Sequence, residues 1–234
     1  MTTQRHWRAY LAQAEALALR EPGSRRALME LGYANGNLCE LTMRQSRDAR
    51  QALPWCEKAT RLMRQAARLP AATRQNQLDL ANRLGWQADV VGKDRQFDRA
   101  LALRREEAAI IAALLKAEPE NRQLRERRLW PEIGAAELEF AAGRFEPGLA
   151  RVRLALADYA RLAALRPDDL SLTVQQFRLV WLAAKAAQAG RHPQAAALEA
   201  EARGYYTRLQ RAYPAEEMTR FDTMMTRITQ GTRK

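Results

Sequence analysis

Apolar residues recur at spacings of three and four over long stretches of this chain, which places them on one face of an α-helix. The clearest stripe consists of Leu149, Val152, Leu156, Tyr159 and Leu162. No alternation of apolar and polar residues at period two survives beyond a few residues, so the pattern predicts no β-strand. We therefore expect an all-α chain.

Five prolines end these helical stretches at nearly constant intervals. They are Pro22, Pro70, Pro119, Pro167 and Pro214, with spacings of 48, 49, 48 and 47 residues. Between successive prolines the pattern predicts a first helix, a short turn and a second helix, which together form one unit. A period of about 20–50 residues is typical of repeat proteins, in which each unit buries its apolar face by stacking on its neighbours.

The turn between the two helices of a unit also recurs. In the third unit the first helix ends at Ala142-Gly143, and glycine accepts the left-handed conformation that often ends a helix. Phe97, Phe145 and His192 follow at spacings of 48 and 47, so we interpret them as equivalent turn positions. Three residues later a small side chain would let the two helices approach closely: Ala100, Gly148 and Ala195.

These features resemble a tetratricopeptide repeat (TPR). The Leu-Gly pair in the first helix of that family has counterparts in Leu31-Gly32, Leu84-Gly85 and Ile133-Gly134. The family's turn has counterparts in Gly143-Arg144-Phe145 and Gly190-Arg191-His192, and its closing proline in Pro70, Pro119, Pro167 and Pro214. A typical unit has about 34 residues, so the longer period here requires longer helices. The chain is similar in this respect to long-helix repeats attached to bacterial serine/threonine kinases, winged-helix regulators and defence proteins.

The resemblance implies a right-handed α-solenoid of antiparallel helix pairs, with about ten helices and a repeat period of 47–49 residues. We expect residues 1–234 to form one such solenoid. Its parts would be a lone N-terminal helix at 5–22, helix-pair units at 23–70, 71–119, 120–167 and 168–214, and a capping helix at 215–230. Because the array begins on a half-unit, the chain either has a special N-terminal cap or is a segment of a larger bacterial kinase, transcriptional regulator or defence protein.

The net charge of +12 and an isoelectric point near 10.5 favour acidic partners, whether protein, nucleic acid or anionic lipid. Two arginine triplets run along predicted helices: Arg122, Arg125 and Arg128, and Arg61, Arg64 and Arg68. Arginine presents a planar fork that suits carboxylate and phosphate, so these triplets could bind an acidic peptide or nucleic acid. The alternative is a solvated outer face in a protein from an arginine-rich genome.

Three tryptophans lie on predicted first helices: Trp86, Trp130 and Trp181. The resemblance implies that first helices line the concave surface, where a tryptophan either belongs to the core or anchors a partner. Pro131 removes a backbone hydrogen bond, so we expect a kink or a new helix start beside Trp130. The candidate partner-binding residues are Tyr33, Asn37, Trp86, Asp89, Arg122, Arg125, Arg128 and Trp130.

Little in the sequence favours catalysis or metal binding. His6 and His192 are the only histidines, and no nucleophile-elbow, zinc-protease, phosphate-loop or dinucleotide motif occurs. Cys39 and Cys56 have no CxxC or Cys/His neighbourhood, so we interpret them as small buried apolar side chains. We predict no enzyme, cofactor or metal. The absence of a long apolar stretch and of a secretory signal predicts a cytoplasmic protein without a membrane partner.

The leading hypothesis is a non-enzymatic interaction scaffold or regulatory module. It would bind an acidic peptide, a partner protein or another copy of itself on the concave face. A nucleic-acid-binding repeat protein is the alternative that the charge favours. The family's clamp for a C-terminal carboxylate is disfavoured, because Asn typically follows the Leu-Gly pair there, whereas Tyr33, Trp86 and Ala135 follow it here.

Overall fold

The computed structural model describes residues 2–46, 48–166 and 168–231. Within these ranges the chain forms eleven α-helices, one short 3-10 helix and no strand, so the prediction of an all-α fold is confirmed. The chain divides into two compact units, residues 1–134 and 135–234, which we describe separately. None of the described helices is both long enough and apolar enough to cross a lipid bilayer.

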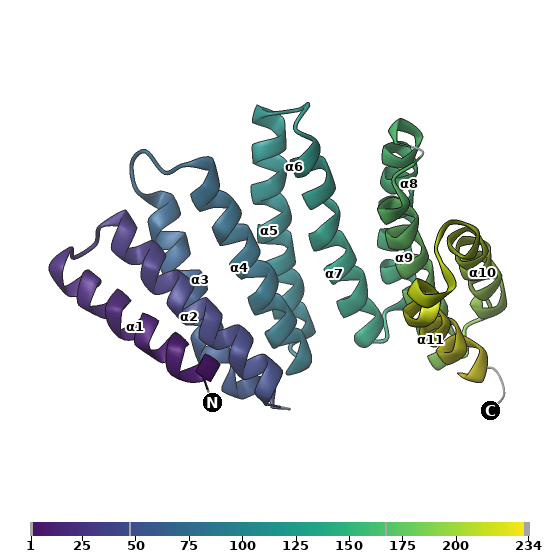
Figure 1. Cartoon of the computed structure of the whole chain (residues 1–234), viewed down its shortest axis with the longest axis horizontal. Coiled ribbons are helices and arrows are strands. Elements are labelled where there is room, and N and C mark those ends of the chain that lie inside the picture. Colours follow the sequence, from purple (N-terminus) through teal and green to yellow (C-terminus); the bar gives the residue numbers. More distant parts are fainter. Residues whose placement is uncertain (1, 47, 167, 232–234) are drawn as a thin grey trace. The chain divides into compact units, whose positions relative to one another are not determined.

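The first unit is a succession of antiparallel helices in which each helix packs against the next (Figure 1). Its elements are α1 (Thr2–Arg20), α2 (Arg25–Gln45), η1 (Ala49–Gln51), α3 (Leu53–Arg68), α4 (Arg74–Lys93), α5 (Phe97–Ala117) and α6 (Arg122–Arg127). Helix α2 also contacts α4, so the first helices of two successive pairs lie next to each other. Helix α7 (Leu129–Ala141) runs across the division between the units.

The periodic prolines mark tight turns between helices. Backbone amides close these turns across three residues, as in the bonds from Ser24 to the Glu21 carbonyl and from Ala72 to the Leu69 carbonyl, both 3.1 Å long. Proline suits the second position of such a turn because its ring fixes φ. A residue with positive φ follows two of these prolines: Gly23 at 71° and Ala71 at 58°. Pro167 lies outside the described residues.

The Leu-Gly pairs of the first helices create space for side chains of second helices. A Cβ atom at Gly32 would lie 2.7 Å from Cε of Met63, which is fully buried in the core between α2, α3 and α4. A non-bonded carbon–carbon approach this close is strongly repulsive, because contacts between carbons are optimal near about 3.5–4.0 Å. Glycine at this position therefore lets the two helices come together around Met63.

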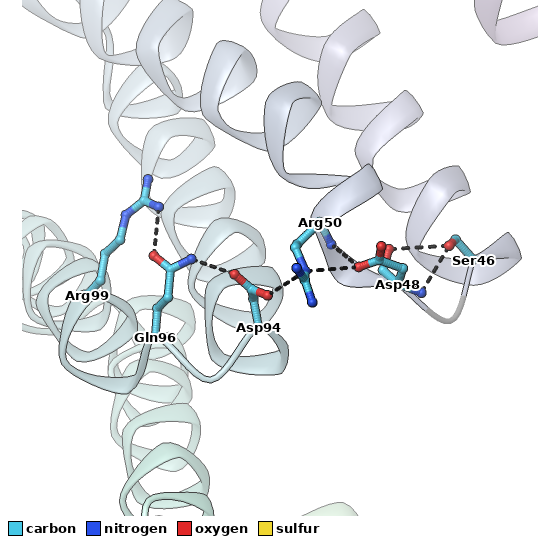
Figure 2. A network of polar contacts seen from close by, with 6 residues as sticks. All are labelled: Ser46, Asp48, Arg50, Asp94, Gln96 and Arg99. Carbon is cyan, nitrogen blue, oxygen red and sulfur yellow. Dashed lines mark hydrogen bonds and ion pairs between the residues drawn. The ribbon is translucent and has the colours of Figure 1, made fainter.

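The irregular turn between α2 and α3 is tied to the turn between α4 and α5 by a series of polar contacts (Figure 2). Asp48 begins η1 by accepting a hydrogen bond of 3.0 Å from the Arg50 amide. Arg50 Nε lies 3.1 Å from Asp94 Oδ1, and Gln96 Nε2 donates to Asp94 Oδ2 at 2.6 Å. Arg99 Nη1 donates to Gln96 Oε1 at 3.1 Å. These contacts join the ends of neighbouring helix pairs.

The structure confirms the expected break beside Pro131. Helix α6 ends at Arg127, Arg128 caps it, and α7 starts at Leu129. Proline lies in the first turn of α7, where its missing amide hydrogen breaks no helical hydrogen bond. The predicted first helix of this unit is therefore two consecutive helices.

The second unit contains the C-terminal part of α7 together with α8 (Phe145–Leu165), α9 (Leu170–Ala189), α10 (Ala195–Ala212) and α11 (Ala215–Gly231). Its core combines many aliphatic side chains with a few buried aromatic rings. Phe177 and Phe221 are almost fully buried, and their rings meet edge to face with centroids 5.7 Å apart. Edge-to-face contact is a favourable geometry for aromatic rings. This pair holds α9 against α11.

The helix-ending turns correct one predicted equivalence. Gly143 has a φ of 75°, as expected for a left-handed helix stop, but Arg95 and Arg191 occupy the corresponding positions with φ of 62° and 51°. The next residues are Gln96, Arg144 and His192, and each donates its amide to a carbonyl five residues earlier. His192 therefore corresponds to Arg144 and not to Phe145. The His192 ring stacks on the Phe145 ring with centroids 3.9 Å apart. His192 therefore supplies the ring at this turn, although it lies one residue before the position equivalent to Phe145.

The prediction for the two cysteines is wrong in one respect. Cys39 in α2 and Cys56 in α3 are both buried, as expected, but they are joined by a disulfide with Cα atoms 5.2 Å apart. This separation lies in the usual range for disulfides. The two residues are 17 positions apart on different helices, so only the pairing of α2 with α3 brings them together.

Candidate partner-binding surface

Two cavities flank helix α2, and each contains one of the predicted partner-binding residues. The larger, of about 440 Å³, lies between α2 and α4 and includes Tyr33 in its wall. The smaller, of about 240 Å³, lies between α1 and α2 and includes Asn37. The side chains around the larger are Arg25, Arg26, Met29, Glu30, Tyr33, Thr73, Gln75, Asn76 and Asp79. Those around the smaller are Trp7, Asn37, Glu40, Leu41 and Arg44.

Two tyrosines of this region donate hydrogen bonds to carboxylates on neighbouring helices. Tyr33 Oη donates to Asp79 Oδ2 at 2.6 Å, and Tyr10 Oη donates to Glu30 Oε2 at 2.5 Å. Burial raises the pKa of both phenols well above its usual value, and the carboxylate partners raise it further. Both phenols therefore stay protonated and keep their partners engaged at neutral pH. Gln75 also donates to Asp79, through Oδ1 at 3.0 Å.

Arg83 lies between these groups on α4 and is half-buried. Its guanidinium rests against α2, because a Cβ atom at Gly36 would lie only 2.4 Å from Arg83 Cζ. It makes no hydrogen bond or ion pair with any residue in the described ranges, and its Nε is buried without a partner. Asp79, Tyr33 and Glu40 influence it through space, but desolvation is the stronger effect and lowers the pKa of Arg83. A half-buried arginine without a hydrogen-bond acceptor is unusual, because buried charges are normally paired.

Asp89, another predicted binding residue, belongs to a different cluster. Arg104 of α5 donates to Asp89 and to Glu107 Oε2, the latter at 2.7 Å. Arg104 and Glu107 are both buried, at 8% and 5% exposure. Burial raises the pKa of Glu107 and the positive charge of Arg104 opposes that rise. A Cβ atom at Gly134 would lie 2.4 Å from Arg104 Cζ, so this arginine also rests against a glycine.

The predicted arginine triplet on α6 is partly engaged within the chain. Arg122 Nε lies 3.2 Å from Glu126 Oε1, and Arg125 donates to the Pro119 carbonyl at 2.9 Å and to Glu120 at 2.8 Å. Arg128 is exposed. Arg125 is therefore a support of the proline turn as well as a surface charge.

The two predicted tryptophan anchors differ in exposure. Trp130 is 52% exposed, and the Arg127 guanidinium lies 5.4 Å from its ring centroid. Trp86, beside Gly85 on α4, is half-buried. The eight predicted residues thus fall into three places: the cavities beside α2, the α4–α5 region around Arg104, and the α6–α7 surface.

Sequence reasoning missed Arg83, Tyr10 and Gly36. One signal was available, because Tyr33 and Asp79 are 46 residues apart, close to one repeat period, and Arg83 follows Asp79 by one helical turn. Residues one period apart on first helices are candidates for contact between neighbouring units. The absence of a partner for Arg83 depends on side-chain directions, which periodicity does not specify.

Comparison with known proteins identifies the fold. No protein-family model and no curated protein matches the chain. Among solved structures, it is similar to the TPR-like repeats of a Podospora anserina protein named as a kinesin light chain, with a TM-score of 0.60 and 20% identity over 86% of this chain and 85% of that chain. It is also similar to BtubC (BKLC) from P. vanneervenii, with a TM-score of 0.47 and 14% identity over 92% and 94% of the two chains. The first similarity confirms that the chain has a TPR-like fold.

Proposed function

We propose that this protein is a non-enzymatic interaction module that binds a peptide or a partner protein on the face formed by the first helices α2 and α4. The observation that carries the proposal is the arrangement around α2, where two cavities lie beside the helix and a half-buried arginine without a hydrogen-bond acceptor lies within electrostatic range of one carboxylate from each wall, Asp79 and Glu40. Such a surface offers both recesses for side chains and an unsatisfied donor for a partner.

The charge of the surface supports an acidic partner. Arg26, at the larger cavity, has a side chain that is 73% exposed and lies 4.0 Å from its nearest carboxylate, Glu21. An exposed ion pair of this length contributes little stability, so the guanidinium remains available to a ligand. Together with the net charge of +12, this favours acidic partners through electrostatic steering as well as through contact.

A photo-crosslinking experiment tests the location. Gln75 is exposed at the larger cavity, and Ala109 is exposed on α5 and does not line either cavity. A benzophenone amino acid at position 75 should capture a reproducible partner from nuclease-treated host lysate, and capture should be competed by excess unmodified protein. The same group at position 109 serves as the control. Equal capture at both positions, or none at 75, would contradict the proposed binding face.

A further inference from the structure

We propose that Arg83 is the anchor for a carboxylate side chain of the partner, and that Tyr33 keeps this arginine available by holding Asp79. The inference rests on the proposed function and assigns a ligand chemistry to the same surface. It concerns one contact between the partner and the α2–α4 face.

The first argument is the unsatisfied hydrogen-bonding capacity of Arg83. An arginine side chain stays charged in a protein and carries five N–H donors. Arg83 uses none of them on a described residue, and only its Nε is fully buried without a partner, so the terminal nitrogens keep contact with solvent while Nη1 also packs against α2 at Gly36. A carboxylate matches these donors in a two-bond geometry, and charge-assisted bonds of this kind are about twice as strong as neutral ones.

The second argument is that the nearby carboxylates are engaged elsewhere. Asp79 and Glu40 both lie within electrostatic range of Arg83, yet neither is paired with it. Asp79 accepts a hydrogen bond of 2.6 Å from the Tyr33 hydroxyl, and Glu40 forms an ion pair of 2.5 Å with Arg44. The tyrosine is a neutral donor, so it orients Asp79 without adding a positive charge. Arg83 is left as the unpaired member of the group.

The third argument is the position of Arg83 against Gly36. Any other residue at position 36 would place its Cβ where the guanidinium lies. Glycine in the middle of a helix is destabilising relative to alanine. At this place the glycine gives the guanidinium room beside α2.

The fourth argument concerns the sign of the charge around the larger cavity. Arg25 donates to the carbonyls of Pro70 and Ala71, at 2.8 and 2.7 Å. Carbonyls are neutral acceptors, so its positive charge is not cancelled by these bonds. Arg26 also lines the cavity, and Arg83 lies within electrostatic range of Asp79 in its wall. The two carboxylates of the wall, Glu30 and Asp79, keep their charges when they accept hydrogen bonds from neutral tyrosines, so three positive charges face two negative ones. An acidic peptide segment suits this arrangement better than a basic one.

A peptide-binding experiment tests the anchor. The probes are two fluorescent acetylated octapeptides, one of alternating Glu and Ala and one of alternating Gln and Ala, and a single-stranded DNA octamer. Affinities are measured by fluorescence anisotropy at physiological salt, where long-range attraction is screened beyond about 8 Å. We expect saturable binding of the Glu peptide and at least roughly tenfold weaker binding of the Gln peptide, as the loss of one charge-assisted hydrogen bond predicts.

Four variants separate the anchor from general charge. Arg83→Gln should weaken binding of the Glu peptide roughly tenfold or more, whereas Arg105→Gln, an equal charge change on α5, should change it less than about twofold. Tyr33→Phe keeps the ring and the net charge but releases Asp79 to pair with Arg83, so binding should also fall. Gly36→Ala should weaken binding by displacing the guanidinium. Circular dichroism verifies that each variant is folded.

Several results would overturn the proposal. Equal losses in Arg83→Gln and Arg105→Gln would show diffuse attraction, and equal binding of the Gln peptide would exclude a carboxylate ligand. No saturable binding of the Glu peptide would exclude the anchor, and tighter binding of the DNA octamer would identify nucleic acid as the partner class. If position 75 still captures its partner in the Arg83→Gln variant, the binding face stands and the anchor alone is wrong. Loss of capture at position 75 in the otherwise unaltered protein rejects the face itself.

Discussion

Arg83 and Arg104 offer a comparison between two neighbouring regions of the same unit. Each guanidinium lies where a glycine, Gly36 or Gly134, leaves space, and a Cβ atom at either glycine would lie 2.4 Å from the arginine Cζ. Arg104 is buried and is bonded to Asp89 and Glu107, whereas Arg83 is half-buried and has no partner among the described residues. The same residue type beside the same small neighbour therefore supports structure in one region and is available for binding in the other.

The difference follows from where the carboxylates point. Around Arg104, both acidic side chains turn toward the guanidinium, which offsets part of the free energy needed to bury the charges. Around Arg83, Tyr33 and Arg44 bind the acidic side chains instead. Removing an arginine should therefore have opposite consequences for stability in the two regions.

The largest expected effect is that of Arg104→Met, which keeps much of the side-chain volume. It leaves Glu107 buried without its cation, and breaking a buried pair in this way costs about 3–5 kcal/mol of unfolding free energy. Chemical denaturation at neutral pH measures the loss. A loss below about 1 kcal/mol would show that Arg104 is not the main support of this cluster.

The pH dependence of the same variant gives a second check. Burial raises the pKa of Glu107, and the positive charge of Arg104 opposes that rise. Without Arg104 the pKa of Glu107 should therefore rise further. A carboxyl group whose folded-state pKa is raised contributes stability in its protonated form, and this contribution is lost as the pH rises through the folded-state value. The stability difference between wild type and Arg104→Met should therefore be smaller at pH 5 than at pH 8. A difference that grows toward pH 5 would contradict this assignment.

An intermediate effect is expected from alanine at the two glycines. At Gly134 the new methyl group meets a buried guanidinium that is held by Glu107, and overpacking of this kind costs about 1–3 kcal/mol. At Gly36 it meets a guanidinium that can swing toward solvent, so the better helix propensity of alanine, up to about 1 kcal/mol, should dominate. Thermal unfolding of both variants compares them directly. Equal destabilisation would mean that Arg83 is as firmly held as Arg104.

The smallest expected effect is that of Arg83→Met. Removing a half-buried charge that lacks a partner should leave stability unchanged or raise it, within about 1 kcal/mol, because no carboxylate loses a hydrogen bond. The measurement is the same denaturant titration as for Arg104→Met. Because both variants introduce a methionine, the difference between their unfolding free energies reflects the loss of each arginine. Strong destabilisation would reveal a structural role for Arg83.

The helical framework could be predicted from the sequence because its signals are local. Apolar spacing, the proline turns and the break at Pro131 each depend on residues within a few positions of one another. Even there the register was misread by one residue at His192, because the left-handed helix stop is at Arg191 and not at Gly190. Arginine in that conformation carries no sequence signal comparable to that of glycine.

The candidate site was predicted only in part, because its defining contacts are between helices. Tyr33 lies on a first helix as expected, and its role in partner binding stays a prediction, but its place beside a cavity, its bond to Asp79 and the resulting isolation of Arg83 depend on how α2 and α4 face each other. The disulfide between Cys39 and Cys56 was missed for the same reason. Asp89 was predicted as a binding residue and is held by Arg104. Whether it also contacts a partner stays a prediction.

Side-chain NMR of the arginine Nη–H groups tests the central claim most directly, because Arg104 uses both of its Nη atoms in hydrogen bonds and Arg83 uses neither on a described residue. Arg83→Lys and Arg104→Lys spectra assign the two signals, and the Glu-Ala octapeptide is then titrated into the wild-type protein. We expect the Arg83 signal to exchange with water faster than the Arg104 signal before peptide is added, and to shift and slow its exchange as the peptide saturates. The Arg104 signal should not change. An Arg83 signal that already exchanges as slowly as that of Arg104, and that stays in place on titration, would show that the arginine is paired within the protein and would contradict the account.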